Sequence, residues 1–239
     1  MTSRSEGLLA GGPEVQVWDL PTRLFHWLLL AGVTTSFITV KLGGNAMIWH
    51  GRAGTFVLSL LVFRVLWGFI GSPTARFANF VKGPKAIWLY LRGVSPKHLT
   101  LGHNPLGALS VVALLGLFLF QALTGLGTSD DIFFDGPLVQ TLSSDTVSLL
   151  TSLHKSTEPF LLGLIALHLA AIAFYRLVKK TNLVRPMITG AKRFQTQPGG
   201  PNSFGEPDPK KLGITEGPGL WLKALVCWLV SLAIVTNLG

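Results

Sequence analysis

The sequence predicts an all-α integral membrane protein, a four-helix bundle with an accessory fifth transmembrane helix. Hydrophobic residues make up 49% of the 239 residues and only 13% are charged, too little charge to cover a soluble domain of this size. Five apolar stretches also approach or exceed the length needed to cross a hydrocarbon core of ~30 Å at about 1.5 Å per residue. The predicted spans are residues 24–42, 51–70, 105–127, 158–178 and 220–238.

The chain begins with a polar segment, residues 1–17, which we expect to be flexible and cytoplasmic. The stretch from Trp18 to Arg23 is predicted to anchor the chain at the membrane surface, with Pro21 in the first turn of a helix. The first span, residues 24–42, does not resemble a signal peptide, because a polar lead precedes it and no small-residue cleavage site follows it.

A short turn joins the first two spans, so we expect these helices to be antiparallel neighbours. The loop of residues 71–103 contains an amphipathic piece, Pro84 to Leu91, which we expect to lie on the membrane surface. Residues 186–219 are predicted to form a cytoplasmic linker before the accessory helix, residues 220–239; its part from 194 to 219 is rich in Pro and Gly and expected to be flexible. The bundle itself is therefore predicted to occupy residues 18–185.

Charge distinguishes the two sides of the predicted membrane protein. The net charge is +9, and the basic residues gather between spans two and three and after span four. Basic loops remain on the cytoplasmic side, so the amino terminus is predicted inside and the carboxyl terminus outside. The basic excess is thus a topology signal rather than a nucleic-acid site. The segment between spans three and four is acidic and is predicted outside; it holds Asp130, Asp131, Asp135 and Asp145.

Four of the six histidines lie in or at the ends of the predicted spans: His26, His50, His154 and His168. An ionisable side chain at membrane depth is costly, so it usually has a partner and a function. His154 and His168 are fourteen residues apart, or ~3.9 helical turns, so their imidazoles share one face about 21 Å apart along the axis. This separation is too long for one metal ion and predicts two cofactors stacked along the membrane normal.

Each predicted cofactor needs a second ligand at matching depth on another helix. Depth pairs His26 with His168 on the inner side and His50 with His154 on the outer side. Bis-histidine ligation leaves haem iron no open position, which suits electron transfer. We therefore predict two haems b with these histidines as iron ligands. Room for the flat macrocycles is expected from small residues: Gly51, Gly54 and Gly163.

Other residues are candidates for binding the haem propionates. Arg64 lies fourteen residues after His50, on the same face near the inner surface, where it would pair with an inner propionate. A snorkelling helix-end cation is an equally good interpretation of Arg64. Arg52 and Lys155 would pair with propionates of the outer haem. His103, at the start of the third span, would reach a propionate, accept a proton from a quinol, or simply cap the helix.

Three features together resemble the bacterial cytochrome b561 family, which includes the b-type subunits of membrane-bound nickel–iron hydrogenases. They are the run WDLPTRLFHW from Trp18, the GHNPLG entry to the third span, and the His154–His168 spacing. The resemblance covers roughly residues 15–185 and implies a four-helix bundle in the bacterial inner membrane. It implies two haems b held by the same four histidines. In an inner membrane, the carboxyl terminus that the charge distribution predicts outside would be periplasmic. The fifth span and the basic linker depart from the core family pattern, so the subfamily stays open.

The resemblance further implies that electrons pass between the quinone pool and a redox partner. One candidate partner is a periplasmic c-type cytochrome docking on the acidic loop, although acidic outer loops also follow from topology alone. The alternative is a hydrogenase or other dehydrogenase subunit, which this protein would anchor while passing electrons to quinone. A transporter with histidine ion ligands is a third hypothesis, disfavoured because the spans lack broken-helix repeats. The sequence leaves the direction of electron flow and homodimerisation open.

Overall fold

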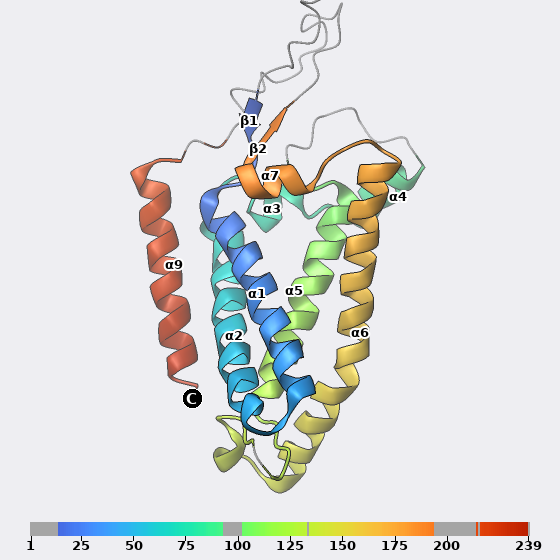
Figure 1. Cartoon of the computed structure of the whole chain (residues 1–239). Helices are drawn as coiled ribbons and strands as arrows, with labels where there is room; N and C mark the ends of the chain where they lie inside the picture. The colour runs from blue at the N-terminus through green and yellow to red at the C-terminus, as the bar shows by residue number, and fades with distance from the viewer. Residues whose placement is uncertain (1–13, 93–101, 133, 194–213, 215, 239) are drawn as a thin grey trace, which may run out of the picture.

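The computed structural model describes residues 14–92, 102–132, 134–193, 214 and 216–238. Within these ranges, five helices are long and apolar enough to cross a membrane (Figure 1). They are α1 (Leu20–Leu42), α2 (Met47–Ile70), α5 (Pro105–Gly125), α6 (Ser144–Leu177) and α9 (Pro218–Thr236). The prediction of an all-α, multi-pass membrane protein is confirmed. The short elements are β1 (Glu14–Gln16), β2 (Ala191–Arg193), α3 (Phe77–Phe80), α4 (Pro84–Leu91), α7 (Val184–Thr189), and the 3₁₀ turns Gly44–Ala46 and Val139–Thr141.

Side-chain caps set the beginnings of three of the long helices, α1, α5 and α6. At α1, the Asp19 carboxylate accepts a hydrogen bond from the Thr22 amide at 2.6 Å, and Pro21 occupies the first turn as predicted. At α6, the Ser143 side chain caps the helix, which begins fourteen residues before the predicted span. Those residues are polar, so a hydropathy window misses them although they are helical. His154 therefore lies well inside α6 rather than at its end.

Helix α2 lies at the centre of the helical packing, because α1, α5 and α9 all pack against it and α6 packs against α5. Its side chains Leu58, Leu61 and Trp67 are at most 1% exposed. Helices α1 and α6, both described along their whole lengths, make almost no backbone contact with each other. The arrangement is therefore open between α1 and α6, and a cavity described below lies on that side.

Helix α9 lies beside α2, outside the group formed by α1, α2, α5 and α6 (Figure 1). Cys227 and Ser231 of α9 are 2% and 0% exposed. Cys227 belongs to a buried apolar cluster that also contains Phe63 and Trp67 of α2. The fifth helix is thus packed closely on α2.

The segments before α1 and after α6 meet at one end of the molecule, the top of Figure 1. Strand β1 pairs antiparallel with β2, and the Val17 and Trp18 amides both donate to the Gly190 carbonyl, at 2.8 and 3.0 Å. Gly190 has φ +85°, and a Cβ there would lie 2.9 Å from the Trp18 carbonyl oxygen, so only glycine fits. Residues 14–17, expected to be flexible, and residues 186–193, assigned to the predicted linker, together form this structure. The other residues of those two predicted segments lie mostly outside the described ranges.

Candidate functional site

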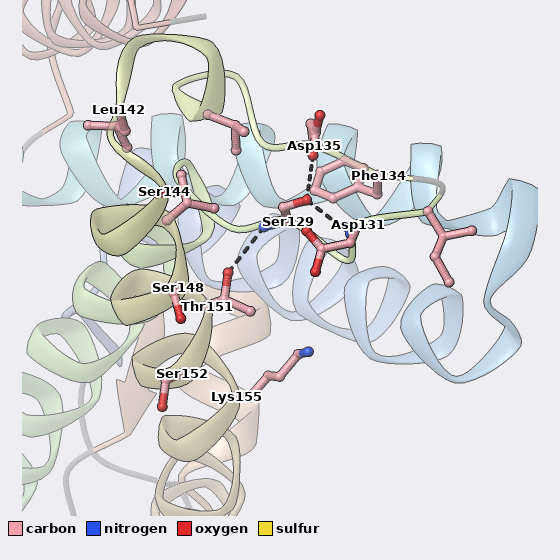
Figure 2. Close-up of a pocket in the computed structure, with 13 residues that line it drawn as sticks. Ser129, Asp131, Phe134, Asp135, Leu142, Ser144, Ser148, Thr151, Ser152 and Lys155 are labelled. Atoms are coloured by element: carbon pink, nitrogen blue, oxygen red, sulfur yellow. Dashed lines mark hydrogen bonds between the residues drawn. The ribbon is translucent and has the colours of Figure 1, made fainter.

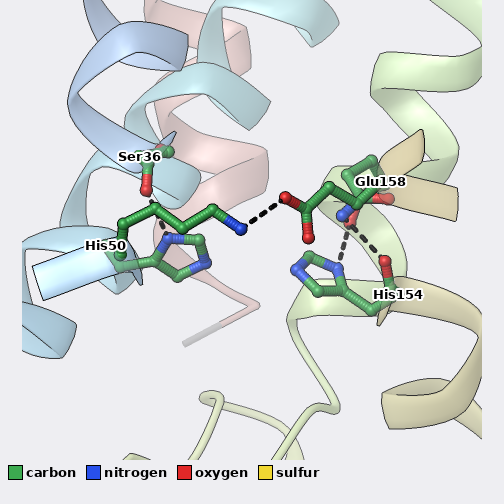
Figure 3. A network of polar contacts seen from close by, with 6 residues as sticks. Ser36, His50, His154 and Glu158 are labelled. Carbon is green, nitrogen blue, oxygen red and sulfur yellow. Dashed lines mark hydrogen bonds and ion pairs between the residues drawn. The ribbon is translucent and has the colours of Figure 1, made fainter. Parts of the chain in front are cut away.

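His50 of α2 and His154 of α6 face each other (Figure 3) near the end of the helices away from β1 and β2, which the predicted topology places outside and which is called the outer end below. Their ring centres are 6.2 Å apart, and the ring planes are at 89°. The Nδ1 atom of His50 lies 2.9 Å from the Ser36 carbonyl oxygen, and that of His154 lies 2.9 Å from the Gln121 carbonyl oxygen. A carbonyl only accepts hydrogen bonds, so each Nδ1 carries the proton and each Nε2 keeps a free lone pair.

This geometry is typical of histidines that bind a metal. Metal-ligating histidines almost always donate the other ring N–H to a carbonyl, a carboxylate or water, which fixes the tautomer and orients the ring. If both Nε2 atoms held one iron at about 2 Å each, the imidazole centres would lie roughly 6 Å apart. The observed 6.2 Å between His50 and His154 matches that separation.

A cavity between α1, α2, α5 and α6 is lined by both imidazoles. Gly54, one turn after His50, also lines it, and a Cβ on Gly54 would have nothing within 4 Å. A Cβ on Gly163 would likewise be in open space. Gly51 differs, because a Cβ there would lie 2.5 Å from the Phe134 ring, whose edge faces His50. Gly54 therefore leaves open space in the cavity, whereas Gly51 lets the Phe134 ring pack close to α2.

The two cations predicted near the outer pair are placed differently. Arg52 is exposed, does not line the cavity, and holds its guanidinium 5.0 Å from the centre of the Trp49 ring. Lys155 lines the cavity and also a neighbouring polar pocket. Glu158, which the sequence analysis did not single out, lines the cavity as well and forms an ion pair with Lys41 at 2.9 Å.

The polar pocket lies at the outer end, in the loop before α6 and the first turns of α6 (Figure 2). Ser129 organises it: its amide donates to Thr151 Oγ1 at 3.2 Å, and its hydroxyl donates to Asp135 at 2.5 Å. The Asp130 carboxylate accepts from the Phe134 amide at 2.8 Å, which holds the loop over the His50 side of the cavity. Two of the four predicted docking aspartates therefore also maintain the loop structure.

The inner histidines, His26 of α1 and His168 of α6, lie within electrostatic reach of each other. In the described part of the chain, His26 Nδ1 is buried and has no hydrogen-bond partner. Arg64 is 3% exposed, with one terminal guanidinium nitrogen equally unpartnered, and its guanidinium lies 5.1 Å from the centre of the Phe77 ring. A snorkelling cation would be exposed, and Arg64 is buried. The snorkelling interpretation therefore does not fit Arg64.

His103 lies between the rings of Trp18 and Phe80, with centroid distances of 4.7 and 4.6 Å. Its ring is partly exposed, but its Nδ1 is buried and lacks a partner among the described residues. Desolvation, together with the nearby charges of Arg64 and His168, lowers the pKa of His103 to about 3. The imidazole is therefore neutral at physiological pH.

Helix capping, one interpretation of His103, is performed by its neighbour. The Asn104 side-chain oxygen accepts from the Gly107 amide at 2.7 Å, and its Nδ2 donates to the Tyr175 hydroxyl at 2.7 Å. The Tyr175 hydroxyl lies 2.6 Å from that of Tyr90, so the network ties α4 to α5 and α6. Burial, followed by the hydrogen bond to Tyr175, raises the pKa of Tyr90 to about 12.

The stretch from Trp18 to Arg23, predicted to anchor the chain at the membrane surface, makes contacts within the protein. Trp18 is 8% exposed and packs on His103. Arg23 donates to the Ile188 carbonyl at 2.7 Å. Asp19, whose role the sequence analysis missed, is fully buried and also accepts hydrogen bonds from Ser72 and Trp67. Its position one residue before Leu-Pro was the available signal for an N-cap.

The family model of prokaryotic cytochrome b561 matches residues 17–190, which contain α1, α2, α5 and α6. The chain belongs to the prokaryotic cytochrome b561 family. It is therefore a multi-pass bacterial membrane protein and a b-type cytochrome of electron transfer, as the resemblance implied. Helix α9 lies beyond the matched residues. No curated protein and no solved structure matches the chain.

The residues of this cytochrome b561 fit b-type haem. On the outer side, two oriented imidazoles line one cavity. On the inner side, the unpartnered buried guanidinium of Arg64 lies near His103 and suits an anionic group such as a propionate, because a buried N–H without an acceptor is costly. Over the described residues, no group of three or more His, Cys, Asp or Glu side chains is arranged around a single ion.

Proposed function

We propose that this cytochrome b561 carries two bis-histidine haems b and passes electrons between quinone and a periplasmic redox partner. The observation that carries the proposal is the outer pair, His50 and His154. Both rings are fixed by backbone carbonyls, both Nε2 atoms are free, and the 6.2 Å between ring centres suits one iron.

The inner haem would be held by His26 and His168. Their mutual proximity and the unpartnered Nδ1 of His26 support this assignment. Arg64 would donate to a propionate of this haem, which would supply the acceptor that its buried guanidinium lacks. On the outer side, Lys155 is the better placed candidate for a propionate, because Arg52 is turned to Trp49 and does not line the cavity.

Quinone would bind beside the inner haem, near His103 and Arg64. Oxidation of a quinol releases two electrons and two protons, so the site needs a proton acceptor as well as an electron acceptor. His103 is the candidate proton acceptor because its Nδ1 is buried without a partner among the described residues. Its pKa of about 3 would have to rise for this role, and an anionic group such as a haem propionate beside the imidazole would raise it.

The redox partner would dock at the opposite end, on the acidic loop. The basic end with β1, β2 and α7 would face the cytoplasm under the positive-inside rule, placing the loop in the periplasm. Asp131 and Asp145 are exposed there, and their charge would attract a basic c-type cytochrome. A dehydrogenase or hydrogenase subunit docking at the same face would send electrons the other way, toward quinone.

The proposal is tested with purified, haem-loaded protein in liposomes under anaerobic conditions. A short-chain quinol is expected to reduce haem b, so that its α-band appears. A basic c-type cytochrome added on the loop side is expected to reoxidise the haem, so that the band disappears. Co-purification with a metalloenzyme and reduction by that enzyme would select the alternative partner. A haem-loaded protein that neither quinol nor either partner reduces would overturn the proposal.

A further inference from the structure

The ion pair between Lys41 and Glu158 joins two helices that are otherwise apart. Lys41 lies in the last turn of α1, and Glu158 lies near the middle of α6. Their charged atoms are 2.9 Å apart across the open side between these helices (Figure 3). Across the described ranges of the chain, this is the one salt bridge.

Stability does not account for this pair. The side chains are 69% and 32% exposed, and ion pairs of that exposure contribute little to folding. Glu158 is the first residue of the predicted fourth span, residues 158–178, and lies inside the long helix α6, where an ionisable side chain usually has a partner and a function. Lys41 is the partner, but it does not explain why a carboxylate is there.

The position of Glu158 relative to the outer histidines suggests its role. Glu158 follows His154 by four residues, so both side chains lie on the same face of α6, and both line the same cavity. Lys41 follows Ser36, whose carbonyl holds His50, by five residues on α1. The pair thus joins the segment of α1 that orients His50 to the segment of α6 that carries His154.

We propose that Glu158 sets the reduction potential of the outer haem and that Lys41 limits its effect; the inference rests on the proposed outer haem. Reduction adds one electron to the ferric iron, so the iron loses one positive charge. A carboxylate in the cavity wall stabilises the ferric form and lowers the potential. Lys41 neutralises part of that field, and the potential of the haem follows the balance between the two charges.

The test is a spectroelectrochemical redox titration of haem-loaded protein, resolved into two components. E158Q should shift one component to higher potential, and K41Q should shift the same component to lower potential. The double variant K41Q/E158Q should lie between the two single variants, and the second component should stay in place in all three. D145N is the matched control, since it removes one exposed carboxylate from the same helix without touching the cavity, and it should shift neither component.

The outcomes separate this inference from the di-haem proposal. If the variants keep two haems and titrate like the wild type, the role of Glu158 is refuted while the haem assignment stands. If wild-type protein lacks haem, the proposed function itself fails. Should E158Q lose haem on purification, K41Q alone still decides, because an unchanged potential in K41Q contradicts the inference.

Discussion

At the outer histidine pair the protein itself fixes both rings, whereas at the inner pair the buried polar atoms lack protein partners. His50 and His154 each donate Nδ1–H to a backbone carbonyl at 2.9 Å. On the inner side, His26, His103 and Arg64 each keep a buried nitrogen without a partner in the part of the chain that the structure describes. The outer imidazoles are preorganised, whereas His26, His103 and Arg64 depend on a bound group for partners. The contrast concerns these nitrogens, because on the outer side the buried oxygens Ser36 Oγ and Gln121 Oε1 also lack a partner among the described residues.

This difference has an energetic consequence. An unsatisfied buried donor costs about 1–3 kcal/mol, and more when it is charged. Haem binding would remove that cost at the inner site, so haem and fold should be coupled more tightly there than at the outer site. The predictions that follow test this contrast, beginning with the largest expected effect.

Removing one ligand from each pair compares the two sites directly. H154A and H168A should each lose one haem per chain and retain the other. H168A should also melt at a lower temperature, because it leaves Arg64 buried without an acceptor. Haem content by pyridine haemochromogen and thermal melting by circular dichroism measure both effects. Equal melting temperatures in the two variants would contradict the tighter coupling of haem and fold at the inner site.

The contribution of Arg64 to the free energy of unfolding should change sign when haem binds. In haem-loaded protein R64M should destabilise by about 1–3 kcal/mol, since a charge-assisted hydrogen bond is lost. In haem-free protein the same change should be neutral or stabilising, because an unsatisfied buried donor is removed. R52M is the matched control, and this exposed site should change stability by less than about 0.5 kcal/mol in both forms. Denaturant titrations of both forms decide whether the sign reverses.

His103 should make stability depend on pH below neutrality. Its folded pKa of about 3 is depressed below the unfolded value of about 6.5, so the unfolded chain binds the extra proton in that window. The contribution of His103 to the free energy of unfolding is therefore complete above pH ~6.5. It falls by up to about 1.4 kcal/mol per pH unit as the pH drops toward 3. H103F should flatten this slope in unfolding titrations between pH 4 and 7. A slope unchanged in H103F would assign the effect to other groups.

The smallest effect is expected at the outer surface. D131N/D145N should slow electron exchange with a basic c-type cytochrome several-fold at low salt and hardly at all at high salt, because screening removes the attraction. D135N serves as the contrast, since Asp135 also holds Ser129 and its loss should disturb the loop at any salt concentration. Stopped-flow rates at two ionic strengths distinguish these behaviours. Rates independent of both salt and charge would exclude electrostatic docking at this loop.

The sequence predicted those features that depend on local periodicity. The five spans and the shared face of His154 and His168 follow from apolar runs and from 3.6 residues per turn. The early start of α6 was missed because its first turns are polar. The contacts of Asp19 with Ser72 and of Lys41 with Glu158 join residues far apart in the chain, and neither helical period nor hydropathy reports such pairs.

The central claim is two bis-histidine haems b per chain, and a haem count on purified wild-type protein with a reduced-minus-oxidised spectrum tests it most directly. The account predicts a sharp b-type α-band and about two haems per chain. One haem would mean that one histidine pair is misassigned. A fully assembled protein without a haem band would contradict the account.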